Sequence, residues 1–272
     1  MTEVQIQRNG LVAVVEMQRP PHNYLDAGLV SDLASTFEEL DADPDCRAIV
    51  LAAAGRSFCA GADFSGRRPD ATSFAGRPAD DNSDAEAGRI DDAGAGSLYH
   101  EALRLFAINT PVIAAVHGAA IGGGLGLTLV ADFRVTCAEA RWSANFSRLG
   151  FHPGFALTYT LPELVGLRHA RRLFFTGCRI DGAEAAAIGL ADECVPQDRV
   201  RTRAFELAEE VASSAPLAVQ AIKATLAGDR LNHLRAATDH ELAEQVRLLA
   251  TDDAREGIAA YAQRRQPTFA AR

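Results

Sequence analysis

Two glycine-containing loops, each placed directly after a short apolar run, constrain the fold of this chain more than any other feature. The first apolar run, residues 47–52 (RAIVLA), leads to a loop at 57–63 (SFCAGAD), and the second, 112–116 (VIAAV), leads to a loop at 117–126 (HGAAIGGGLG). Short runs without polar interruption are typical of strands buried on both faces of a sheet. A strand that feeds three glycines into a helix leaves unpaired backbone N–H groups, which stabilise negative charge.

The second loop does not match the common nucleotide-binding patterns. Residues 122–126 (GGGLG) are out of register with GxGxxG, and the Gly-Lys-Ser/Thr sequence of a Walker loop is absent. The glycines alone fit two interpretations: a tight turn that lets a helix pack closely on a strand, and a loop that approaches a ligand. Cys59, in the first loop, is interpreted as a packing residue and not as a nucleophile.

The pattern of the remaining chain predicts an α/β protein, with strands and helices alternating early and helices accumulating late. Residues 4–17 read as a hairpin around Asn9-Gly10, and residues 25–40 place apolar side chains on one helical face. Asn23 is expected to be a turn residue or helix cap, and Pro162 a turn or first helical residue. Further strands are expected at 133–137 and 190–195, and further helices at 98–108, 168–175, 181–188, 200–211, 216–227, 233–249 and 254–264.

Charge and cysteine content exclude several classes of function. Lys+Arg 27 against Asp+Glu 36 gives a net charge of −9, so no general attraction to nucleic acid or anionic membrane is expected. The five cysteines form no CxxC pair, so neither a zinc site nor a redox pair is predicted. No segment reads as a transmembrane span, and residues 1–10 lack the apolar core of a signal peptide, which predicts a cytoplasmic protein.

Four separated segments together resemble the enoyl-CoA hydratase/isomerase family, also called the crotonase superfamily. They are AIVLAAAGRSFCAGAD, PVIAAVHGAAIGGGLGLTLVADFRV, LFFTGCRIDGAEAAAIGLADECVP and DDAREGIAAYAQRR. The resemblance implies a spiral core of ββα units at 1–198, with a variable, mobile loop at 64–97, and a helical trimerisation region at 199–272. It further implies a homotrimer or a dimer of trimers that acts on an acyl-CoA thioester. Coenzyme A is then part of the substrate, and no permanently bound cofactor is expected.

The resemblance assigns the backbone N–H groups of Ala62 and Gly123 to an oxyanion hole. These groups would hold the thioester oxygen as it becomes an enolate or a tetrahedral oxyanion. The chemistry agrees, because such an intermediate needs two preorganised donors. Contacts to coenzyme A are implied at a further set of residues: Ala60, Ala62, Arg67, Arg68, Tyr261 and Arg264. The two loop arginines are expected either to pair with a phosphate or to remain solvated.

The chain departs from the family pattern where a hydratase carries its two glutamates, since those positions hold Gly126 and Phe146. Neither residue can transfer a proton or hold a water molecule, and syn addition of water to an enoyl thioester needs paired carboxylates. Ordinary hydration is therefore not expected. His152 lies where other family members place acid–base groups, and it is a candidate acid or base or a structural histidine before Pro153.

Three functions remain after this comparison. The first is an acyl-CoA isomerase, lyase or hydrolase, in which isomerisation, decarboxylation and C–C or thioester hydrolysis stay open. The second is a non-catalytic acyl-CoA-binding homologue that lost the glutamates. The third is an enoyl-CoA hydratase that uses substitute acid–base groups.

Overall fold

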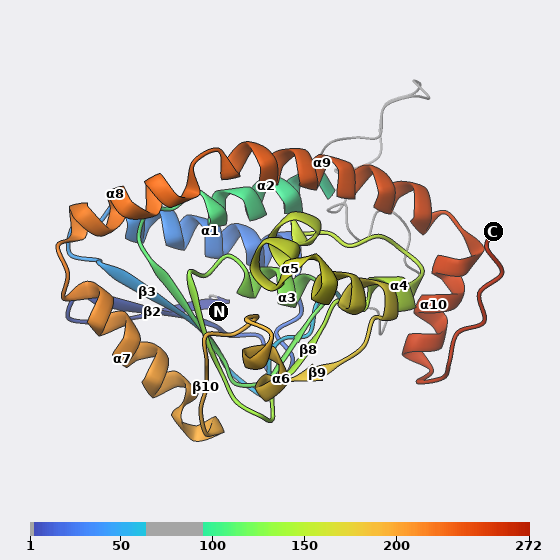
Figure 1. Ribbon diagram of the computed structural model, residues 1–272, viewed down its shortest axis with the longest axis horizontal. Coiled ribbons are helices and arrows are strands. Elements are labelled where there is room, and N and C mark those ends of the chain that lie inside the picture. Colours follow the sequence, from blue (N-terminus) through green and yellow to red (C-terminus); the bar gives the residue numbers. More distant parts are fainter. Residues whose placement is uncertain (1–2, 64–94) are drawn as a thin grey trace.

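The computed structural model describes residues 3–63 and 95–272, and its largest feature is a six-stranded sheet (Figure 1). The strands lie in the order β1 (Val4–Asn9), β2 (Val12–Met17), β3 (Ala48–Ala53), β5 (Val112–Val116), β7 (Phe133–Thr136) and β10 (Glu193–Cys194). Only β1 is antiparallel to its neighbour. The two apolar runs form β3 and β5, which lie side by side at the centre, and every residue of both strands is buried.

A second sheet takes three of its four strands from segments that directly follow strands of the first. Its four strands are β4 (Ser57–Cys59), β6 (Ala119–Ile121), β8 (Arg141–Ser143) and β9 (Ile180–Asp181). The chain passes from β3 to β4, from β5 to β6 and from β7 to β8. The next described element after these pairs is α2 (Ala95–Phe106), α3 (Gly123–Thr128) or α4 (Phe146–Leu149). This threefold ββα unit confirms the α/β spiral that the sequence resemblance implied.

Helices cover both faces of the six-stranded sheet. The remaining helices are α1 (Ala27–Asp41), α5 (Leu157–Thr176), α6 (Gly182–Ala187), α7 (Val200–Ala212), α8 (Pro216–Ala227), α9 (Arg230–Leu249) and α10 (Asp252–Ala262), with a 3-10 turn at Gln197–Arg199. α7 packs against β3, β5 and β7, and Figure 1 shows α1, α2 and α9 stacked in succession on the other side. Among the described residues, no helix is both long and apolar enough to cross a membrane.

α1 shows how the sequence sets the limits of a helix. Asp26 accepts a hydrogen bond from the Leu29 N–H at 2.9 Å and so caps the first turn. The apolar residues that share one face, Leu29, Leu33, Phe37 and Leu40, are all buried. The predicted helix is therefore confirmed, and it begins at Ala27 because the residue before it supplies the cap.

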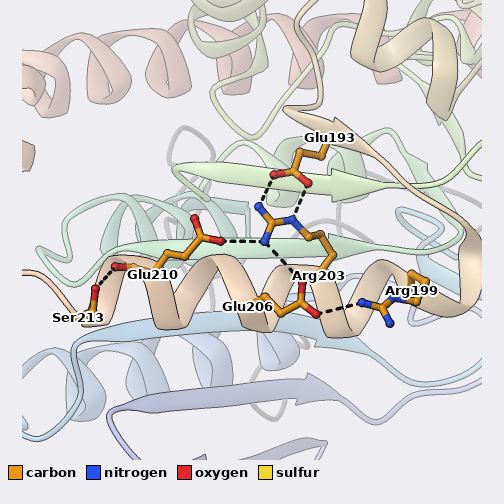
Figure 2. A network of polar contacts seen from close by, with 6 residues as sticks. All are labelled: Glu193, Arg199, Arg203, Glu206, Glu210 and Ser213. Carbon is orange, nitrogen blue, oxygen red and sulfur yellow. Dashed lines mark hydrogen bonds and ion pairs between the residues drawn. The ribbon is translucent and has the colours of Figure 1, made fainter.

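A network of ion pairs fixes α7 to the edge strand β10 (Figure 2). Arg203 on α7 donates to both carboxylate oxygens of Glu193 on β10, at 2.7 and 2.8 Å, and to Glu210 at 2.9 Å. The Arg203 guanidinium also lowers the pKa of Glu193. α7 thus packs as a layer of the core although it follows residue 198. The division into parts 1–198 and 199–272 stays a prediction.

α8 leaves an apolar surface uncovered in the single chain. None of its residues is buried, and Leu217, Ile222 and Leu226 are 79%, 59% and 83% exposed. Exposed leucines of this density on one helix are typical of a surface that another protein covers.

Two local predictions differ from the structure. The strand expected at 190–195 is only two residues long, because β10 is an edge strand that pairs with β7 alone. Pro162 neither starts a helix nor forms a turn, since it lies inside α5. The interruption of α5 is instead at Gly166, whose φ of 72° and ψ of 157° are not helical.

Candidate active site

The two glycine loops leave neighbouring parallel strands at the same edge of the small sheet. β4 pairs in parallel with β6, and Cys59 lies opposite Ala120. Because the carboxyl ends of parallel strands meet at one edge, the loops that follow them lie side by side. A Cβ placed on Gly61 would be 3.7 Å from the Gly123 nitrogen. The strand pairing therefore brings the two predicted N–H donors together.

A glycine in a left-handed conformation precedes each predicted donor. Gly61, before Ala62, has a φ of 78°, and Gly122, before Gly123, has a φ of 57°. L side chains rarely adopt these angles, so glycine is needed to turn the next peptide group. A Cβ on Gly61 would also lie 2.6 Å from the Ile121 carbonyl oxygen. Neither donor N–H bonds to another described residue, and both residues line one cavity.

The sequence left two interpretations of the glycines in the second loop, a tight packing turn and an approach to a ligand. Gly124 fits the first of them. A Cβ on Gly124 would lie 2.1 Å from the Cys59 carbonyl oxygen, so α3 approaches β4 as closely as only glycine permits. Cys59 is fully buried, and burial raises the pKa of its thiol to about 12. Cys59 is therefore a packing residue, as the sequence predicted.

The turn that follows Pro20 and Pro21 makes hydrogen bonds that fix the first loop. Asn23 is fully buried with a φ of 49°. Its side-chain amide donates to the carbonyl oxygens of Ala54 at 2.7 Å and Ser57 at 2.8 Å. The Gly61 carbonyl oxygen in turn accepts from the Leu25 N–H at 2.9 Å. Asn23 is thus a turn residue, and it fixes the loop that presents Ala62.

The two loops open onto a cavity of about 280 Å³. Most of its wall is apolar, because aliphatic and aromatic side chains from several elements line it. These residues are Leu25, Leu98, Ile121, Phe146, Leu149, Phe151 and Phe155. The polar side chains in the wall are fewer: Asp26, Tyr99, Asn145, Gln245 and Tyr261.

Asp26 is the one carboxylate among the described residues that line the cavity. It caps α1 and forms an ion pair with Arg19 at 2.6 Å. Burial raises the pKa of Asp26, but hydrogen bonds from the Arg19 guanidinium and the Leu29 N–H outweigh it and hold the pKa below its usual value. Asp26 is therefore ionised and already paired, which makes it a poor proton carrier.

Aromatic rings fill the space at both positions where the resemblance places the family's glutamates. A Cβ on Gly126 would lie 2.8 Å from both Cβ and Cδ1 of Phe155, so this position has no room for a side chain. Phe146 lines the cavity, and its Cζ lies 3.7 Å from the Cβ position of Gly122. The wall beside the donors is thus apolar at the two positions where hydration needs carboxylates.

A buried carboxylate holds Phe155 in place. Phe155 and Ala156 both have positive φ angles, 64° and 56°. Glu241 on α9 is fully buried and accepts from the Ala156 N–H at 2.8 Å. It also accepts from the Thr158 N–H at 2.7 Å and the Thr158 hydroxyl at 2.6 Å. Burial raises the pKa of Glu241 to about 7, although these three hydrogen bonds lower it.

A second polar contact joins α9 to α2 across the same wall. The Tyr99 hydroxyl donates to Gln245 Oε1, and Gln245 Nε2 donates to the His152 carbonyl oxygen at 2.9 Å. A Cβ on Gly154 would lie 2.3 Å from the Tyr99 hydroxyl, so glycine is required there too. Burial raises the pKa of Tyr99, which keeps its phenol protonated.

The structure does not place the side chain of His152 in the cavity. Its neighbours Phe151 and Gly154 line the wall, but His152 does not. Its Nδ1 lies 2.9 Å from the Pro153 carbonyl oxygen, and its ring contacts His240 on α9 at a centroid distance of 5.6 Å. The loop turns this side chain toward α9, so its position gives no support to the predicted acid–base role.

The residues implied to bind coenzyme A divide into three groups. Ala60, Ala62 and Tyr261 line the cavity. Arg264 is exposed just beyond the end of α10 and does not line it. The remaining two, Arg67 and Arg68, lie outside the described residues, as does the loop predicted from residue 64 as far as residue 94.

Five polar residues of the site were not predicted from the sequence: Asp26, Tyr99, Asn145, Glu241 and Gln245. Glu241 and Gln245 are one helical turn apart, and both are buried on α9. Two polar residues on the buried stripe of a helix are the signal that identifies such a pair. Tyr99 and Asn145 have no comparable local signal, because only the packing of α2 and α4 brings them to the cavity.

Comparisons with known proteins agree on the relatives of this chain. A family model described as Enoyl-CoA hydratase/isomerase matches residues 7–272. The chain is 30% identical over 270 residues to a probable enoyl-CoA hydratase of Bacillus subtilis, covering 99% of each protein. It is 30% identical over 269 residues to the short-chain-enoyl-CoA hydratase of Clostridium acetobutylicum, covering 98% of this chain and 97% of that protein. The crystal structure of an enoyl-CoA hydratase/isomerase from Pseudoalteromonas atlantica matches with a TM-score of 0.83 and 28% identity, covering 99% of this chain and 100% of that one.

The raised pKa of Glu241 predicts a specific pH dependence of stability. The carboxyl has its usual pKa of 4.5 when unfolded and a pKa of about 7 when folded. Between these values the folded state binds more protons, so its stability falls as pH rises and levels off above about pH 7. Urea unfolding should show wild type losing about 2 kcal/mol relative to Glu241→Gln between pH 5 and pH 8. Two curves that stay parallel over this range would contradict the assignment.

Proposed function

The chain belongs to the enoyl-CoA hydratase/isomerase family, and from that premise we propose that it binds an acyl-CoA thioester and polarises its carbonyl group. The thioester oxygen accepts hydrogen bonds from the N–H groups of Ala62 and Gly123. The observation that carries the proposal is the parallel pair β4 and β6, whose loops each turn through a left-handed glycine into one cavity. Two fixed donors stabilise the charge that develops on this oxygen in an enolate or tetrahedral intermediate.

The proposed chemistry does not include ordinary hydration of an enoyl thioester. Hydration needs one carboxylate to activate water and one to deliver a proton. Gly126 and Phe146 supply neither, and Phe155 fills the adjoining space. Reactions that form an enolate or oxyanion by another route remain: isomerisation, decarboxylation, and C–C or thioester hydrolysis.

One observation favours a second candidate, a non-catalytic acyl-CoA-binding protein. The only carboxylate among the described cavity residues, Asp26, is already paired with Arg19. A cavity with two donors and no available acid or base binds a thioester without transforming it. Turnover against a panel of acyl-CoA thioesters, measured beside their binding, separates the two candidates.

We also propose where the coenzyme A moiety lies. Tyr261 lines the cavity and is 42% exposed, so it stands at the mouth, through which the rest of the ligand must pass. Ala60 and Ala62, in the first loop, also line the cavity. Arg264, three residues after Tyr261 and just beyond the end of α10, is an exposed cation for the coenzyme A phosphates.

Gly122→Ala tests the donor geometry, because Gly122 orients the Gly123 N–H. Alanine resists a φ of 57° and turns the peptide group away, so the affinity for butyryl-CoA should fall about tenfold. Isothermal titration calorimetry measures the change. Gly10→Ala is the matched control: Gly10 has a φ of 61° and no atom within 4 Å of an added Cβ. It places an alanine at a similar positive φ outside the cavity, and an equal loss of affinity in both variants would refute the assignment.

Crotonyl-CoA should bind without being hydrated. The expected result is a dissociation constant measurable by calorimetry together with a turnover at background in an absorbance assay of the conjugated thioester. Gly126→Glu should not restore turnover, because Phe155 occupies the space that the new side chain needs. A wild-type turnover of about 10 per second or more would show that substitute groups exist.

We propose that the exposed apolar face of α8 is covered in a homotrimer or a dimer of trimers. Light scattering after size exclusion should then give three or six times the chain mass of 28.9 kDa. Charge on that face, introduced as Leu217→Glu with Leu226→Glu, should lower the mass, because both side chains are exposed in the single chain. A wild-type particle of 28.9 kDa at micromolar concentration is the result that excludes this assembly.

A further inference from the structure

One buried polar side chain in the cavity wall has no hydrogen-bond partner among the described residues. Asp26 is paired with Arg19, and Tyr99 and Gln245 bond to each other. Asn145 is only 9% exposed, and its side-chain amide makes no hydrogen bond to any described residue. It lines the cavity, so the small accessible part of this amide faces the interior of the site.

The backbone around Asn145 places this amide beside the proposed oxyanion hole. The residue connects β8 to α4, and its carbonyl oxygen accepts from the Arg148 N–H at 3.0 Å. β8 is also hydrogen-bonded to the second glycine loop, since Ser143 accepts from the Gly122 N–H at 2.9 Å. Asn145 Oδ1 lies 3.4 Å from the Cβ position of Gly122, the residue before the donor Gly123.

A structural role does not account for this position. Asparagine often caps a helix with its side chain, yet Asn145 precedes α4 and forms no side-chain cap. The amide keeps some contact with the cavity interior, since neither of its polar atoms is among the fully buried unpaired atoms of the described residues. A ligand that fills the cavity removes this contact, and leaving the amide unpaired then costs about 1–3 kcal/mol. A ligand that hydrogen-bonds to the amide avoids this cost.

We propose that Asn145 hydrogen-bonds a neutral oxygen, a keto or hydroxyl group, on the acyl chain of the substrate. The inference rests on the proposed function, since the thioester oxygen must sit at Ala62 and Gly123 for a nearby acyl carbon to face Asn145. The ligand group is neutral because no cationic side chain among the described residues lines the cavity, and an unpaired carboxylate there would be strongly disfavoured. The amide can donate to a ketone and can accept from a hydroxyl.

The experiment compares butyryl-CoA, 3-hydroxybutyryl-CoA and acetoacetyl-CoA by calorimetry in wild type and in Asn145→Leu, which is close in size. Wild type should bind at least one oxygenated thioester about tenfold more tightly than butyryl-CoA. Asn145→Leu should lose that preference while still binding butyryl-CoA, which also shows that the variant folds.

The outcomes distinguish a failure of the inference about Asn145 from a failure of the proposed function. If all three thioesters bind wild type with equal affinity, or if Asn145→Leu keeps the wild-type preference, the inference about Asn145 is overturned and the proposed function stands. If none of the three binds wild type, the proposed function falls and the inference falls with it.

Discussion

The parallel pairing of two three-residue strands, β4 and β6, is the contact on which the rest of the site depends. It brings together two loops that are about 60 residues apart in the chain, and it leaves the backbone of each free at the same edge. The left-handed glycines, the turn around Asn23 and the close approach of α3 at Gly124 all serve this juxtaposition. The proposed binding of a carbonyl oxygen thereby depends on main-chain N–H groups and not on particular side chains.

The side chains around that edge support the proposal that the reaction is not hydration. Phe146 and Phe155 make the wall apolar where a proton carrier is needed, and Glu241 keeps Phe155 there through the backbone of Ala156. Glu241 and Gln245 both belong to α9, in the C-terminal region whose implied role is trimerisation. This region therefore also shapes the cavity, so a change in how α9 packs would alter the site as well as the assembly.

Much of the fold could be predicted from the sequence because its strongest patterns are local. The run at 112–116 is β5 with the expected bounds, and the helix expected at 216–227 is α8 with the expected bounds. The small sheet was missed, because strands of two or three residues are too short to show alternation.

The side-chain environment of the site was also beyond local patterns. Phe155 meets Gly126 across 29 residues, and Glu241 reaches Ala156 across 85. His152 shows the converse: its sequence position indicated the cavity, but the loop directs its ring toward His240. The sequence could therefore predict which residues lie near the site. The direction in which each side chain points depends on tertiary packing and could not be predicted from local patterns.

An infrared spectrum of bound butyryl-CoA, labelled with ¹³C at the thioester carbonyl, tests the central claim most directly. Two N–H donors draw electron density onto the carbonyl oxygen and weaken the double bond. The account predicts that the labelled carbonyl band of the bound ligand lies at lower frequency than the same band in water. A band at or above its frequency in water would contradict the claim that Ala62 and Gly123 polarise the thioester.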